Sequence, residues 1–134
     1  MMQATELRIG NYLQQSGSTL IFRARSIIAR EKPAKEGYNI YDERGFIRLI
    51  EEIKPIPLTE QWLIDFGFKN GCMPINFWNG SISCELVLHE SRKSFIATIE
   101  PIEAKIYHSI IIKHVHQLQN LYHALTNTEL QLKK

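Results

Sequence analysis

The sequence predicts a single α+β domain in which two antiparallel β sections are each followed by a helix. Short runs of alternating apolar and polar residues, separated by turn-forming residues, are typical of antiparallel strands. Two other segments carry apolar residues at helical spacing and are flanked by residues suited to helix ends. The length of 134 residues suits one domain, and 44% hydrophobic with 22% charged residues is ordinary for a globular protein.

The first β section is expected over residues 1–54. A strand is predicted at 8–13, and a longer one at 19–29. Residues 38–41 and 46–52 flank a four-residue, glycine-bearing turn and predict a hairpin. By analogy, these short strands resemble an SH3-like barrel. The apolar face of the long strand is predicted to consist of Leu20, Phe22, Ala24, Ser26 and Ile28.

Residues 55–70 are expected to form a linker and a short helix. Thr59 suits the N-cap of a helix over 60–66, because its hydroxyl can accept a hydrogen bond from the first turn. Gly67 suits the left-handed position that follows a helix, where the absence of Cβ removes a steric penalty. Phe68 then falls where it contacts Leu63, so the sequence predicts a Schellman ending.

The second β section is expected over residues 71–113. Its strands are predicted at 75–78, 81–89, 94–100 and 107–113, the first two joined by an Asn-Gly turn. The Cys84 thiol lies in phase with two leucines of its strand and is therefore predicted to be buried.

The C-terminal section, residues 114–134, is expected to contain a helix over 115–125. Its apolar stripe is predicted to consist of Val115, Leu118, Leu121, Tyr122 and Leu125. The opposite, polar face is either simply solvated or binds a partner, and it consists of His116, Gln119, Asn120 and His123. The two histidines are seven residues apart, roughly 10.5 Å along a helix, so no metal site is predicted.

A basic stretch in the first β section is the candidate for binding an anion or a nucleic acid. Arginines two residues apart on a strand project from the same face, and Tyr38 and Tyr41 could stack on bases. The alternative is that these charges protect a sheet edge from pairing. The basic residues are Arg23, Arg25, Arg30, Lys32 and Lys35.

No pattern of catalytic or cofactor-binding residues is recognised. The sequence has no nucleophile elbow, phosphate-binding loop or dinucleotide fingerprint, and its two cysteines have no zinc-type spacing. We therefore expect a protein without catalytic activity or cofactor. The first 13 residues lack the layout of a secretory signal, and no apolar run approaches the ~20 residues that span a bilayer. A cytoplasmic protein with no membrane segment is expected.

Three segments resemble a family of small uncharacterised proteins from Bacteroidetes genomes, phages and mobile elements. They are residues 7–12 (LRIGNY), 55–68 (PIPLTEQWLIDFGF) and 115–126 (VHQLQNLYHALT). Asn127 stands where the family commonly has glycine, and because asparagine is the next-best residue in the left-handed conformation, the helix is expected to end there. The loop at 31–37 is longer than in typical members. The resemblance implies an origin and no particular activity.

The sequence thus favours a non-catalytic binding protein of phage or mobile-element type, which engages a host protein or a second copy of itself. The alternative is binding of nucleic acid or a phosphorylated nucleotide through the surface of Arg23 and Arg25, which would include sequestration of a nucleotide in counter-defence. A hydrolase is the third hypothesis.

Overall fold

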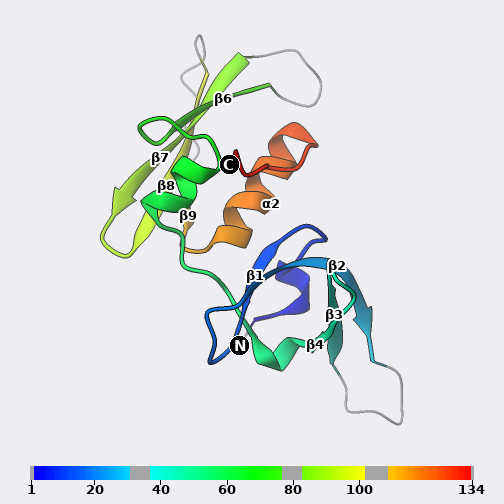
Figure 1. Cartoon of the computed structure of the whole chain (residues 1–134). Coiled ribbons are helices and arrows are strands. Elements are labelled where there is room, and N and C mark those ends of the chain that lie inside the picture. Colours follow the sequence, from blue (N-terminus) through cyan, green and yellow to red (C-terminus); the bar gives the residue numbers. More distant parts are fainter. Residues whose placement is uncertain (1, 31–36, 77–82, 102–108, 134) are drawn as a thin grey trace. The chain divides into compact units, whose positions relative to one another are not determined.

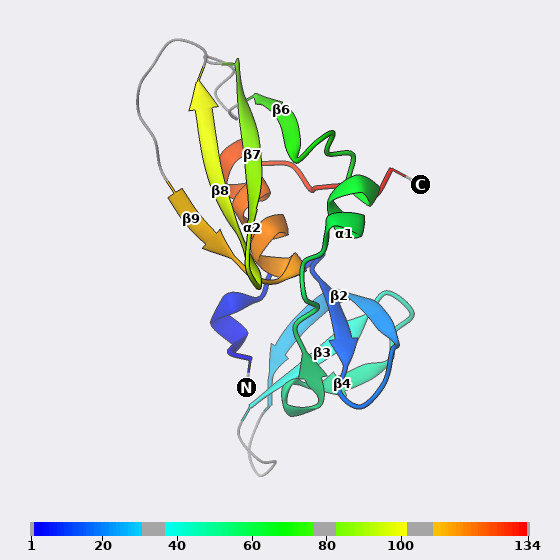
Figure 2. The same ribbon diagram turned by 90° about the vertical axis from the view of Figure 1, so that its left-hand side faces the viewer.

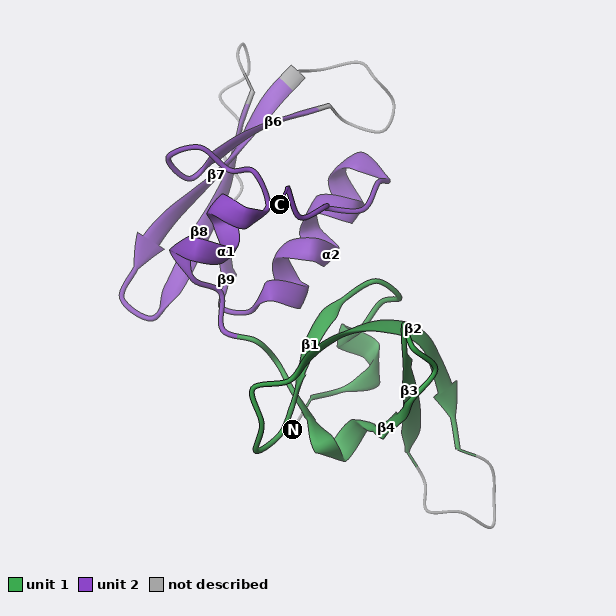
Figure 3. Cartoon of the chain, viewed as in Figure 1, with its two compact units in different colours: residues 1–56 green, residues 57–134 purple. Residues whose placement is uncertain are grey.

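The computed structural model describes residues 2–30, 37–76, 83–101 and 109–133 (Figure 1). The chain divides into two compact units, Met1–Ile56 (unit 1) and Pro57–Lys134 (unit 2) (Figure 3). Each unit contains one antiparallel sheet, and the predicted α+β class is confirmed. The division falls close to the predicted end of the first β section at residue 54.

Unit 1 is built on a five-stranded sheet in the order β4-β3-β2-β1-β5, in which every neighbouring pair is antiparallel. A 3₁₀ helix, η2, precedes the last strand, and another, η1 (Ala4–Glu6), precedes the first. This order, with a 3₁₀ turn before the final strand, is that of an SH3-like barrel. The elements are β1 (Tyr12–Gln15), β2 (Ile21–Ala29), β3 (Tyr38–Asp42), β4 (Ile47–Leu49), η2 (Ile50–Glu52) and β5 (Ile53–Lys54).

The first strand begins later than predicted because residues 8–11 form a turn. Gly10 has a φ of 100°, which L side chains rarely adopt, and the Asn11 side chain accepts a hydrogen bond of 2.6 Å from the Arg8 amide. The predicted strand over 46–52 is likewise cut short, since η2 replaces its second half.

The long strand β2 is shared between two halves of the sheet and bends between them. Its first half pairs with β1 and its second half with β3, and the register shifts between Ala24 and Ser26. Such a bulge changes which side chains face the core. Ile27 therefore packs against the core, whereas Ile28, predicted to share a face with Phe22, is 51% exposed. The predicted regular alternation along this strand is wrong beyond the bulge.

The core of unit 1 is small and draws on β1, β2, β3 and β5. Burying each large apolar side chain contributes about 1.5–3 kcal/mol relative to leaving it in water. The buried cluster consists of Met2, Leu13, Phe22, Ala24, Ile40 and Ile53.

Unit 2 contains a four-stranded antiparallel sheet in the order β6-β7-β8-β9, with helix α2 along one face (Figure 2). A short helix, α1, leads into the sheet. The elements are α1 (Glu60–Asp65), β6 (Cys72–Asn76), β7 (Ser83–Ser91), β8 (Ser94–Pro101), β9 (Ser109–Ile112) and α2 (Val115–Thr126). The predicted Asn-Gly turn at residues 79 and 80 and the adjoining Trp78 lie outside the described residues.

Helix α1 begins and ends as its sequence predicts. The Thr59 hydroxyl accepts the Trp62 amide at 3.3 Å. At the other end the Phe68 amide donates to the Leu63 carbonyl and the Gly67 amide donates to that of Ile64, each at 2.9 Å. These two hydrogen bonds are the pair that defines a Schellman motif. Gly67 has the positive φ that the motif needs.

Helix α2 buries more of its circumference than predicted. Val115 and Leu118 are fully buried, as expected for the apolar stripe. His116 and Gln119, predicted to face solvent, are 2% and 0% exposed. Asn127 ends the helix in the left-handed conformation, with a φ of 57°, as its position predicts.

Candidate functional site

A buried carboxylate organises the turn that joins β3 to β4. One oxygen of Asp42, Oδ1, accepts the backbone amides of Arg44 and Phe46, both at 2.9 Å. Its other oxygen, Oδ2, lies 3.1 Å from the Arg48 guanidinium. The Gly45 amide donates to the Asp42 carbonyl, which closes the turn. The backbone of the turn is thus held from inside unit 1 by a single side chain.

Backbone amides and an arginine stabilise the negative charge of Asp42. Burial alone would raise the pKa of this carboxyl, but hydrogen bonds from the Phe46 and Arg44 amides, together with the Arg48 guanidinium, hold the pKa below its ordinary value. The Arg48 guanidinium lies 4.5 Å from the centroid of the Phe22 ring and also donates to Gln15 Oε1. Asp42 is therefore an ionised anchor for the turn.

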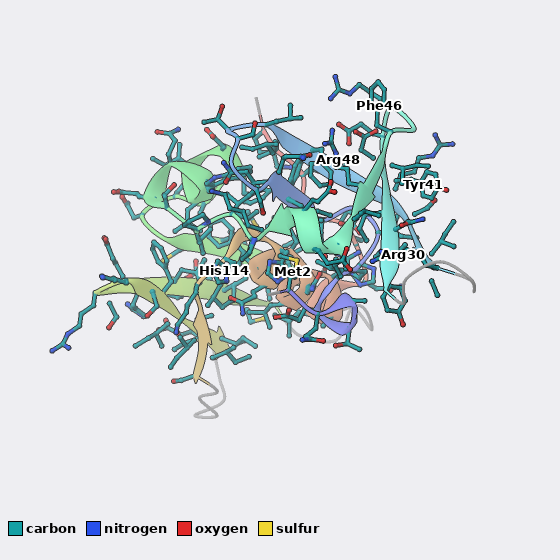
Figure 4. The ribbon with its side chains drawn as sticks, turned by 90° about the horizontal axis from the view of Figure 1, so that it is seen from below. Met2, Arg30, Tyr41, Phe46, Arg48 and His114 are labelled. Carbon is teal, nitrogen blue, oxygen red and sulfur yellow. The ribbon has the colours of Figure 1, made fainter. Side chains whose placement is uncertain are left out.

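The outer side of the same strands carries a shallow pocket of about 250 Å³. Ser26, Tyr41 and Ile47 lie directly across from one another on β2, β3 and β4, so their side chains share one face. In Figure 4, Tyr41 and Arg48 lie on opposite sides of the β3–β4 hairpin. The pocket is lined by Arg25, Ser26, Ile28, Tyr41 and Gly45.

The turn adds a second exposed pair next to this pocket. Phe46 is 59% exposed, and the Arg44 guanidinium lies 5.6 Å from the centroid of its ring. Ile47 beside it is 57% exposed. We name the surface of Arg25, Ile28, Tyr41, Arg44 and Phe46 the Arg25–Phe46 surface.

The structure separates the basic residues that the sequence grouped together. The Arg23 guanidinium lies 5.3 Å from the centroid of the Tyr12 ring, and its Nε donates to the Gly10 carbonyl at 3.3 Å. Arg30 is 8% exposed and forms an ion pair with Glu51. Arg25 is exposed and lines the pocket.

The remaining members of the predicted basic and aromatic set are placed as follows. Tyr38 is 40% exposed at the start of β3, and Tyr41 lines the pocket. Lys32 and Lys35 lie outside the described residues.

The predicted partner surface on α2 is not one solvent-facing surface. His116 and Gln119 are buried, and only Asn120 and His123 remain partly exposed. The His114 and His116 rings stack with centroids 5.8 Å apart. The described residues contain no group of three or more His, Cys, Asp or Glu side chains that could hold a metal ion.

The Cys84 thiol is buried, as the sequence predicts. Cys84 is 3% exposed, and burial raises the pKa of its thiol. A thiol in this setting is a poor nucleophile.

Sequence reasoning missed Asp42, Arg44 and Phe46. Aspartate at the first position of a glycine-bearing turn is a recognised arrangement, in which the side chain accepts amides further along the turn. That pattern could have marked Asp42 as the anchor. Nothing in the sequence indicates that Phe46 is exposed, because its position predicts the first apolar residue of a strand.

Comparison with protein families, with curated proteins and with solved structures finds no match for this chain. Within the described residues, no helix is long and apolar enough to cross a bilayer.

Proposed function

We propose that the protein is a non-catalytic binding protein whose unit 1 binds single-stranded nucleic acid through the Arg25–Phe46 surface. The observation that supports this most strongly is the exposed Phe46 ring with the Arg44 guanidinium beside it, next to a pocket lined by Tyr41 and the exposed Arg25. Single strands are bound in this way, because rings stack on bases while cations contact the phosphates.

The distribution of charge supports an anionic ligand. Unit 1 has nine Lys and Arg residues against seven Asp and Glu, whereas unit 2 has seven of each. Two of the acids in unit 1, Asp42 and Glu51, are already paired with arginines. Within the described residues neither Arg25 nor Arg44 forms a salt bridge, so both are available to phosphates.

The aromatic groups support a ligand with planar bases. The Phe46 ring is exposed and Tyr41 lines the shallow pocket, so a flipped or unpaired base has a ring to stack on. Stacking on such a ring contributes about 1–3 kcal/mol per base and tolerates different sequences. A paired duplex keeps its bases covered and would use only the charges.

A protein partner, the first expectation from the sequence, is less well supported at the site predicted for it. Two of the four side chains on α2 are buried, which leaves little polar surface there. We also propose that the protein is cytoplasmic and comes from a Bacteroidetes phage or mobile element. The support for this origin is the family resemblance of residues 7–12, 55–68 and 115–126.

Fluorescence anisotropy with labelled single-stranded oligonucleotides tests the proposal. We expect binding that weakens as salt rises, and weaker binding to a duplex of the same length. Arg25→Ala should reduce the slope of log K against log salt by about 0.7, the value for one phosphate contact on a single strand. Phe46→Ala should weaken binding by about 1–3 kcal/mol with an unchanged slope.

Matched controls come from unit 2, where Lys93 is an exposed cation and Ile64 is a 55% exposed apolar residue. Lys93→Ala and Ile64→Ala should leave both affinity and salt slope unchanged. Binding that is absent, or that responds to the control variants as strongly as to Arg25→Ala and Phe46→Ala, would overturn the proposal.

A further inference from the structure

Among the described strands, four lie at the edges of the two sheets, and three of these carry features that discourage pairing with another strand. Natural proteins protect edges with short strands, charges and prolines. β4 has three residues and includes the inward-pointing Arg48, while β5 has two residues and includes Lys54. β6 contains Pro74, which has no amide to donate.

The fourth edge, β9, is also short, but it differs from the other three in composition. Its four residues, Ser109–Ile112, include no charge and no proline. Ile110 is 42% exposed and Ile111 is 63% exposed. Figure 2 shows β9 as the outermost strand of the unit 2 sheet, and β8 is its only sheet neighbour among the described strands.

Among the described residues, the chain covers this edge only beyond the end of β9. The Leu58 amide donates to the Lys113 carbonyl at 2.9 Å, and Pro57 forms an isolated antiparallel bridge with His114. Helix α1 begins at Glu60 and takes the chain away from the edge. Within the described residues, the backbone of β9 therefore has one side open to another strand.

We infer that β9 pairs with β9 of a second copy of this chain, in antiparallel orientation about a two-fold axis. An uncharged apolar strand is complementary to itself, because no like charges are brought together. Two such edges would join the two four-stranded sheets into one continuous sheet. Ile111 lies opposite Ile96 of β8, so the partner's strand would extend an apolar row that already exists.

The other edge of the sheet explains why this association would stop at two copies. A two-fold interface uses the same edge on both copies, so β6 becomes the edge strand at both ends of the joined sheet. Pro74 discourages further pairing there. Four residues bury little area, so the dimer should be weak and should depend on protein concentration.

Sedimentation velocity over a series of concentrations tests this inference. The unaltered protein should shift from monomer to dimer mass as concentration rises. Ile111→Lys places a charge on the edge and should keep the protein monomeric. Ile64→Lys changes an isoleucine of similar exposure on α1 and should leave the shift unchanged.

Hydrogen exchange on the unaltered protein provides a test that does not depend on a variant's folding. Amides of β9 should become more protected as concentration rises, while those of β4 should not change. A protein that is monomeric throughout, or a dimer that persists in Ile111→Lys, would overturn the inference. So would protection of β9 that appears only when a different protein is added. None of these measurements involves nucleic acid, so their outcome is independent of the proposed function.

Discussion

Replacing Asp42 with asparagine keeps one oxygen that can accept the turn amides but removes the charge that faces Arg48. The carboxylate is fully buried and the Arg48 side chain is 12% exposed, so the guanidinium would remain largely buried without its counter-charge. Removing one partner of a buried pair costs about 3–5 kcal/mol. We expect Asp42→Asn to lower the free energy of unfolding of unit 1 by the lower end of that range, because Arg48 retains some contact with water.

The pH dependence provides an independent check. The pKa of Asp42 in the folded protein lies below its ordinary value of 3.8. Its contribution to stability is therefore complete above that ordinary value and is lost as the pH falls through the lower folded-state pKa. The difference in stability between the unaltered protein and the variant should be constant near neutral pH and should shrink in acid.

Urea-dependent hydrogen exchange at the β3 amides measures this stability within unit 1. Glu52→Gln, at an exposed carboxylate of the same unit, is the matched control and should change little. The double variant Asp42→Asn with Arg48→Met should recover part of the loss, because it no longer leaves a buried charge. A loss below about 1 kcal/mol, or a loss unchanged down to strong acid, would refute the role of Asp42 as an ionised anchor.

Three further predictions concern unit 2. Leu118→Ala removes a fully buried side chain of α2 and should lower stability by about 2–5 kcal/mol, measured by denaturant unfolding. Gly67→Ala should cost about 1 kcal/mol or more, because φ is 97° and the new Cβ would lie 3.0 Å from Lys133 Cγ; an unchanged melting temperature would contradict this. A thiol reagent should label Cys84 much more slowly than the half-buried Cys72, and the two rates should converge in denaturant.

The extent to which sequence alone predicts this structure depends on how far apart the interacting residues are. The Thr59 cap, the Gly67 ending and the left-handed Asn127 were all predicted, because each depends on partners within about one helical turn. The α+β class was predicted for the same reason, since strand and helix periodicity are local patterns.

Only the tertiary structure decided which polar side chains are buried and which cations are free. The bulge near Arg25 reverses the exposure of Ile27 and Ile28 because β2 must serve two halves of one sheet. Arg30 is engaged by Glu51, an acid 21 residues away, and so does not join Arg25 on the Arg25–Phe46 surface. His116 is buried although its helix position predicts exposure. Local spacing specifies how a segment is shaped, but burial and charge pairing depend on what packs against it, and that is fixed only when distant segments come together.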